Sequence, residues 1–183
     1  MLRGRRQRRR AEREAFGRGG TASRYQVRAK MLSIGDDFWI ENAAGERVYK
    51  VDGKALRVRK TLVFEDAHGQ ELCKVKERVL RVKDSMSVEG PDGERMALIK
   101  KAMVTPLRER WVVKVEDGPD LEVQGNVVDH EYEIERDGAK IAEISKRWFR
   151  VRDTYGVEIA PGQNDIIVLA VTTAIDSMAH HGV

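Results

Sequence analysis

The segment that most constrains the fold lies near the carboxyl end of the chain, from Asn164 to Met178. No charged residue occurs from Ile166 to Ile175, and the apolar side chains occupy every side of a helical wheel. Asn164 or Asp165 can cap the N-terminus of such a helix. A surface helix carries a single apolar stripe, so a helix that is apolar all round is expected to be enclosed by the rest of the protein.

The predicted helix covers residues 165–179, and its part from Ile166 to Met178 is about 20 Å long at roughly 1.5 Å per residue. A bilayer core needs about 20 consecutive apolar residues, so no transmembrane span is predicted. The side chains that we expect to form the core of the structure are Ile166, Ile167, Val168, Leu169, Val171, Ile175 and Met178.

The preceding chain repeats one pattern, an apolar strand followed by a turn with glycine and then a second strand. The repeated glycines are Gly45, Gly69, Gly93, Gly118, Gly138 and Gly156. Three of them directly follow Asp, a strong signal for a hairpin turn that requires positive φ. Six hairpins predict about twelve antiparallel strands in sequential order.

Apolar residues alternate along these strands, as Trp111, Val113 and Val115 do, which predicts one buried and one exposed face. About twelve strands would close into a barrel whose lumen matches the diameter of a helix, roughly 10 Å. The predicted fold is therefore mainly β, a closed antiparallel barrel around the C-terminal helix, with residues 24–183 as a single domain.

This arrangement resembles the LURP-one-related family, whose fold is that of the tubby C-terminal domain and the phospholipid scramblases. The likeness is carried by the Gly45/Gly69/Gly93 series, the opening segment 25–30 and the apolar segment 165–176. It implies a β-barrel around a buried helix and little chemistry. Its relatives imply phosphoinositide binding or lipid-linked roles, but no acidic loop like a calcium site precedes the helix, which argues against scramblase activity.

The first 23 residues are expected to form a disordered basic arm, because they contain too few apolar residues to bury. Residues 1–20 carry eight Arg and two Glu, a net +6, whereas the whole chain is +4, so the remaining residues carry −2. The arm can attract phosphates of nucleic acid or anionic lipid, or serve only as a solubilising tail. The arginines that we consider for binding are Arg3, Arg5, Arg6, Arg8, Arg9, Arg10 and Arg13.

A second group of basic residues, here called the basic ladder, lies on two strands expected to be neighbours. Its outward faces could form a positive surface for anionic headgroups, or be an ordinary exposed sheet face neutralised by nearby glutamates. The basic ladder consists of Arg57, Arg59, Lys60, Lys74, Lys76, Arg78, Arg81 and Lys83.

Residues that could support catalysis lack the spacing that catalysis needs. His68, His130, His180 and His181 have no cysteine or carboxylate at metal-ligand spacing and are expected to have surface or capping roles. Cys73 has no evident histidine partner, and as the only cysteine it excludes an internal disulfide and fits a reducing compartment. No hydrolase, protease or nucleotide-binding motif occurs, so we predict no catalytic residues, no metal and no cofactor.

The leading hypothesis is a non-enzymatic binding or scaffold module, recruited to anionic phospholipid, phosphoinositide or a protein partner through its basic surface. The first alternative is a nucleic-acid-binding protein that acts through the arginine-rich arm, and the second is an enzyme of unknown reaction. No secretory signal follows the basic residues, so the expected location is the cytoplasm, including the periphery of the membrane.

Overall fold

The computed structural model describes residues 2–16, 19–28, 37–53, 61–78, 85–102, 109–148 and 154–179. The helices in these ranges are α1 (Leu2–Ala15) and α2 (Asp165–Ala179). The strands are β1 (Ser23–Arg28), β2 (Phe38–Asn42), β3 (Arg47–Gly53), β4 (Thr61–Asp66), β5 (Glu71–Glu77), β6 (Ser85–Glu89), β7 (Arg95–Lys101), β8 (Glu109–Val115), β9 (Leu121–Asn126), β10 (Glu131–Arg136), β11 (Ala139–Ser145) and β12 (Thr154–Ile159).

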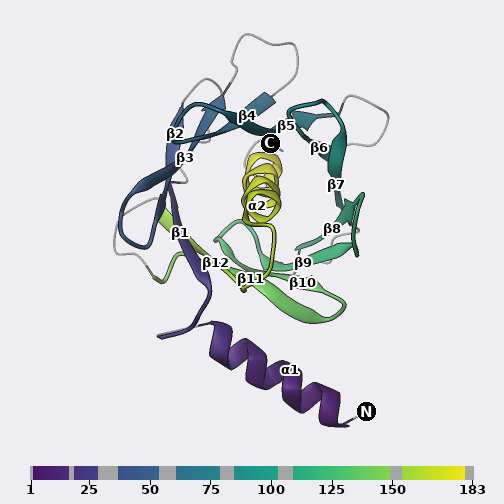
Figure 1. Ribbon diagram of the computed structural model, residues 1–183. Helices are drawn as coiled ribbons and strands as arrows, with labels where there is room; N and C mark the ends of the chain where they lie inside the picture. Colours follow the sequence, from purple (N-terminus) through teal and green to yellow (C-terminus); the bar gives the residue numbers. More distant parts are fainter. Residues whose placement is uncertain are drawn as a thin grey trace.

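The twelve strands form one closed barrel in which each strand is antiparallel to its neighbours. Strands follow one another around the ring in chain order from β2 to β12, and β1 closes it between β12 and β2. Figure 1 looks along the barrel and shows α2 inside the ring and α1 outside it. The predicted fold class, a closed barrel of about twelve strands around the C-terminal helix, is confirmed.

The alternating pattern of each strand separates the lumen from the outer surface. In β8, Trp111 and Val113 are fully buried, whereas Arg110 and Lys114 are exposed on the outside. The inward side chains of the strands join α2 in one hydrophobic core. Burial of apolar surface, worth about 25 cal/mol per Å², is the main force that holds α2 inside the ring of strands.

Glycine turns connect the strand pairs, as the hairpin pattern predicts. In the turn between β2 and β3, Gly45 has a φ of 80° and its N–H donates to the carbonyl of Asn42 at 3.0 Å. The Asn42 side chain also accepts from the backbone N–H of Ala44 and Glu46, at 2.9 and 3.0 Å. The sixth predicted hairpin is wrong, because Gly156 lies inside β12, where it pairs with Gln26 and Ser145.

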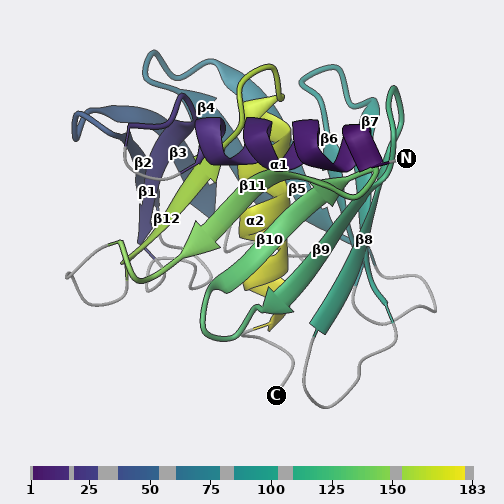
Figure 2. The ribbon, with the colours of Figure 1, turned by 90° about the horizontal axis from the view of Figure 1, so that it is seen from below.

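Helix α2 runs along the barrel axis (Figure 2). Asn164 is its N-cap, since its side-chain oxygen accepts from the N–H of Ile167 at 3.1 Å. Thr172 and Thr173 donate their hydroxyls to the carbonyls of Val168 and Leu169, both at 2.9 Å, which satisfies them inside the core.

The predicted core positions of α2 are enclosed along its middle and less so at its ends. Every residue from Val168 to Ser177 is buried, whereas Ile166, Ile167 and Met178 are partly exposed. These three lie in the first and last turns, where the helix reaches the two ends of the ring. Burial at the ends therefore depends on what the barrel rim contributes.

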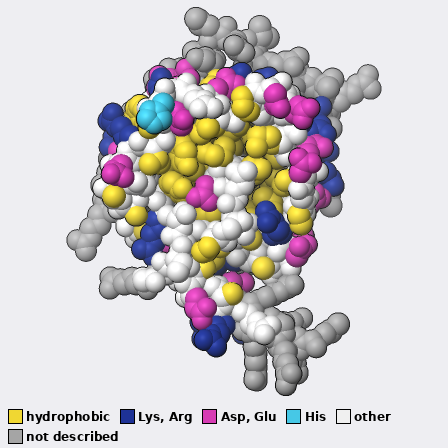
Figure 3. Space-filling model, viewed as in Figure 1, with side chains coloured by type: hydrophobic (Ala, Val, Ile, Leu, Met, Phe, Trp, Pro, Cys, Tyr) yellow, Lys and Arg dark blue, Asp and Glu magenta, His cyan; other side chains and the backbone are white. Residues whose placement is uncertain are grey.

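The barrel end that faces the viewer in Figure 1 is closed by apolar side chains. Figure 3 shows hydrophobic side chains gathered in the middle of this face, with charged side chains of both signs mostly around the rim. The Tyr25 hydroxyl donates to the Asp165 carboxylate at 2.6 Å, joining β1 to the start of α2. Burial, together with this bond to Asp165, raises the pKa of Tyr25 well above its usual value.

Candidate functional site: the groove beneath the N-terminal helix

The arginine-rich segment is helical where the sequence analysis expects a disordered arm. Its Arg, Glu, Gln and Ala residues all have favourable helix propensities. Arg10 and Glu14 form an i,i+4 ion pair at 2.8 Å, and this pair raises the pKa of Arg10. The prediction of disorder considered only the shortage of apolar residues, and it did not anticipate a surface on the barrel against which the helix could pack.

That surface is β11, and the contact uses the last turns of α1. Ala15 is buried, and the Lys140 ammonium lies 4.7 Å from the centre of the Phe16 ring. The backbone N–H of Lys140 also donates to the Glu12 carboxylate at 3.4 Å. After the helix, the N–H of Ala22 donates to the carbonyl of Ala15 at 3.0 Å, which fixes the connection to β1.

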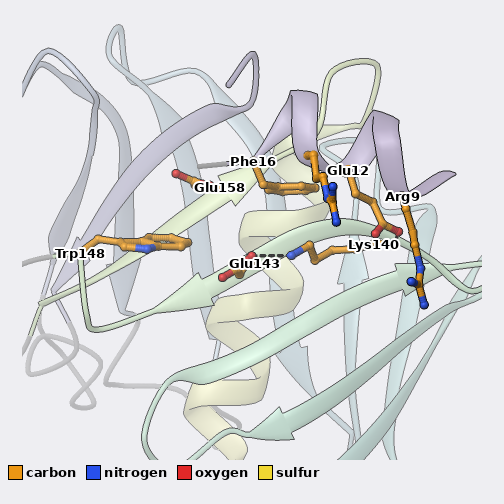
Figure 4. A pocket seen from close by; sticks show the side chains of 8 residues that line it. Arg9, Glu12, Phe16, Lys140, Glu143, Trp148 and Glu158 are labelled. Atoms are coloured by element: carbon orange, nitrogen blue, oxygen red, sulfur yellow. Dashed lines mark hydrogen bonds and ion pairs between the residues drawn. The ribbon is translucent and has the colours of Figure 1, made fainter. Parts of the chain in front are cut away.

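A groove of about 500 Å³ lies between α1 and the outer face of the barrel. Figure 4 shows Arg9 and Glu12 extending from α1 toward β11, with Trp148 at the opposite end of the groove. Trp148 is 39% exposed, one of two large hydrophobic residues that are exposed among the described residues. The groove is lined by Arg9, Glu12, Arg13, Phe16, Lys140, Glu143, Trp148 and Glu158.

Two groove residues, Glu143 and Glu158, belong to a cross-strand line of carboxylates, here called the glutamate row, which also includes Glu133 on β10. Glu158 lies directly opposite Glu143, and Glu143 lies directly opposite Glu133, on β12, β11 and β10. Like charges placed directly opposite one another destabilise a sheet by a few tenths to about 1 kcal/mol per pair. The glutamate row therefore needs nearby positive charge.

Two barrel cations supply part of that charge. Arg24 pairs with Glu158 at 2.8 Å, and Lys140 pairs with Glu143 at 2.6 Å and with Glu133 at 3.3 Å. Partial burial lowers the pKa of Lys140, but the neighbouring carboxylates outweigh it, so the net shift is upward. Lys140 is therefore fully charged at neutral pH and joins the glutamate row to Phe16 of α1.

Of the basic ladder, the structure describes Lys74, Lys76 and Arg78. β4 and β5 are neighbours as expected, but Lys74 pairs with Glu71 at 2.7 Å and Lys76 pairs with Glu89. Arg78 is half-buried just after β5. The predicted sites Arg57, Arg59, Lys60, Arg81 and Lys83 lie outside the described residues.

The arginines of the arm lie on α1, outside the barrel (Figure 1). Arg9, Arg10 and Arg13 are exposed on α1. Arg3, Arg5, Arg6 and Arg8 also belong to α1, although their side chains are outside the described set. The structure thus gathers the arm residues onto one helix.

A buried polar cluster inside the barrel was missed by the sequence analysis. His130, expected on the surface, is 1% exposed, and its Nε2 lies 3.2 Å from the carboxylate of Asp176 on α2. The His130 ring stacks on Tyr155 with centroids 4.4 Å apart. Burial, with Asp176 as the next contribution, raises the pKa of both Tyr132 and Tyr155. Asp176 could have indicated this cluster from the sequence, because a carboxylate in an enclosed helix needs a polar partner.

Among the described residues, no group of three or more His, Cys, Asp and Glu side chains is arranged to hold a metal ion. A second, smaller hollow of about 310 Å³ adjoins the α1 groove, sharing Glu143 and extending over β9 and β10. Neither helix in the described ranges is long and apolar enough to cross a membrane.

The barrel matches a known protein family. The model of the LURP-one-related family matches residues 23–176, which span β1 through most of α2. The chain belongs to the LURP-one-related family. The match begins after α1, so the arginine-rich helix lies outside the part that the family model describes.

A solved structure supports the fold of this LURP-one-related protein. The X-ray structure of an Arabidopsis thaliana protein superposes with a TM-score of 0.64 at 15% identity, covering 86% of this chain and 91% of that chain. At this level of identity the likeness establishes the shared fold alone. No curated protein matches the sequence.

Proposed function

We propose that this LURP-one-related protein is a non-enzymatic binding module that is recruited to anionic phospholipid bilayers through α1. The main support for the proposal is that the positive charge of the chain is concentrated in its first 20 residues. Residues 1–20 hold a net +6 and the rest of the chain −2, and the described arginines of α1 are exposed. An anionic leaflet attracts basic residues near its surface with about 1 kcal/mol each.

A binding role is favoured over catalysis because the usual barrel pocket is filled. Leu169, Ala170 and Val171 of α2 are fully enclosed by the strands. In the α1 groove, Lys140 and the glutamate row are engaged in ion pairs, which suits a structural charge network better than proton transfer. The His130–Asp176 pair is 2% and 0% exposed, so a substrate would have no access to it.

Trp148 favours a bilayer over nucleic acid as the partner. Its exposed ring lines the same groove as Arg9 and Arg13, at the end opposite Arg9 in Figure 4. Tryptophan is enriched at the membrane–water interface, where its ring sits at headgroup level. Figure 1 shows α1 outside the ring of strands, where its exposed arginines can approach a partner surface.

Vesicle co-sedimentation tests this proposal, with vesicles of phosphatidylcholine alone and of phosphatidylcholine mixed with phosphatidylserine. The protein should bind the anionic vesicles and not the neutral ones. Replacing Arg9, Arg10 and Arg13 with Gln should weaken binding roughly a hundredfold, at about 1 kcal/mol per residue. Equal binding to both kinds of vesicle would overturn the lipid assignment.

The matched control replaces Arg95, Lys100 and Lys114 with Gln, which removes the same charge from exposed positions on β7 and β8. Its binding should change much less than that of the α1 variant. A second variant, with Lys74 and Lys76 changed to Gln, tests the basic ladder. A loss as large as that of the α1 variant would move the site to β5. Binding to duplex DNA or RNA without binding to vesicles would instead favour the nucleic-acid alternative.

A further inference from the structure

We infer that α1 is a displaceable helix that docks on the glutamate row in the free protein and leaves it when it binds an anionic bilayer. This regulation rests on the proposed function, because it concerns the same arginines. The α1 groove is then an internal docking surface for a basic helix, and it competes with the membrane for α1.

Helix α1 and the strands beneath it carry complementary charges. Arg9 and Arg13 line the groove whose floor carries Glu143 and Glu158. Three carboxylates directly opposite one another are unfavourable in a sheet unless cations lie close by. Arg24 and Lys140 pair with the glutamate row, and Arg9 and Arg13 of α1 bring further positive charge into the same groove.

The contact between α1 and β11 is small and partly polar. Among the described side chains of α1, Ala15 is the buried one, and Phe16 beyond its end is half-buried over Lys140. A hydrogen bond of 3.4 Å also runs from the Lys140 N–H to the Glu12 carboxylate. Exposed charge pairs are weak and are screened by salt, so this attachment can be displaced by a competing anionic surface.

Helix α1 needs a supporting surface to remain helical when it leaves the barrel. An isolated helix of 14 residues is marginal in water, so the helical state of α1 depends on its contact with β11 or on another surface. A bilayer can provide such a surface and would take up Arg9 and Arg13, which cannot face the glutamate row and the leaflet together. Binding to the membrane should therefore cost the docking contact, and weakening the dock should strengthen membrane binding.

The test replaces Glu133 and Glu143 with Gln and leaves Glu158 in place as the partner of Arg24. The control replaces Glu46 and Glu94 with Gln, which makes the same change in net charge at exposed positions beside hairpin turns. In the absence of lipid, hydrogen exchange over residues 2–15 should be faster in the first variant than in the control. Exchange equal to the control would overturn the docking.

The same two variants are then compared on anionic vesicles. The Glu133/Glu143 variant should bind roughly three- to tenfold more tightly than the Glu46/Glu94 control, the range expected for a few exposed charge pairs. Equal or weaker binding, while the unmodified protein binds well, would overturn the competition and leave the proposed function intact. Failure of the unmodified protein and of both variants to bind would overturn both the release and the proposed function.

Discussion

At the scale of single residues, a carboxyl group lies within the largely apolar interior. Asp176 is fully buried on α2, and it meets His130, which is held at a φ of 53° in the turn between β9 and β10. Buried carboxylates are tolerated when paired and hydrogen-bonded. The pair therefore fixes the last part of α2 against one side of the barrel, in a core that is otherwise mostly apolar.

Replacing Asp176 with Ala should lower the free energy of unfolding by about 3–5 kcal/mol, because it leaves His130 buried beside an empty space. The double variant with His130→Ala should cost less than the two single changes together, since the pair is already broken by either one. Urea denaturation measures each variant. Asp129→Ala, an exposed neighbour of His130, is the control, and equal costs at positions 129 and 176 would contradict the assigned role.

Cys73 provides a second test at this scale. It is fully buried in β5, and burial raises the pKa of its thiol from 9.0 to about 12. Iodoacetamide should therefore modify it only in unfolded chains, because the thiolate is the reactive form. Between pH 9 and about 12 the unfolded chain releases this proton and the folded chain keeps it, so Cys73 should lower stability as the pH rises through that range. Rapid modification of the native protein near neutral pH would contradict the enclosure of β5.

At the scale of elements, some segments could be predicted from the sequence because their pattern repeats. Alternation and glycine turns predicted the strands, and the uncharged stretch predicted α2. Gly156 was misassigned because a glycine spacing alone does not distinguish a turn from a strand, and in β12 this glycine is fully paired on both sides. Helix α1 was missed because its stability comes from propensity and from β11, not from an apolar stripe.

Gly125 shows a constraint on β9 that no sequence pattern revealed. Its φ is 142°, and a Cβ atom there would lie 2.6 Å from the carbonyl oxygen of Glu131 and 2.6 Å from the Cα atom of Tyr132. Gly125→Ala should therefore destabilise the protein by about 1–3 kcal/mol through backbone strain. Gly118→Ala is the control, since its Cβ atom would lie 3.7 Å from Val115, an ordinary contact. Thermal unfolding compares the two, and equal transition temperatures would contradict the close approach of β9 and β10.

At the scale of the whole molecule, the barrel encloses its own C-terminal helix, so the proposed recognition takes place on the outer surface. The basic arm was identified from charge counting alone. The glutamate row could not be predicted from the sequence, because it depends on strand register and on the irregularity between Ile134 and Glu135. The ion pair of Lys76 with Glu89 could not be predicted either, because it depends on β5 and β6 becoming neighbours.

Hydrogen exchange of the α2 amides most directly tests this view of a filled barrel. The amides from Val168 to Ile175 should exchange only through global unfolding, with protection that equals the free energy of unfolding measured by urea. They should also respond to denaturant as steeply as the core strands do. Exchange of α2 at a clearly lower free energy than that of β7 and β8 would mean that the helix leaves the barrel on its own, and would contradict the permanently filled lumen.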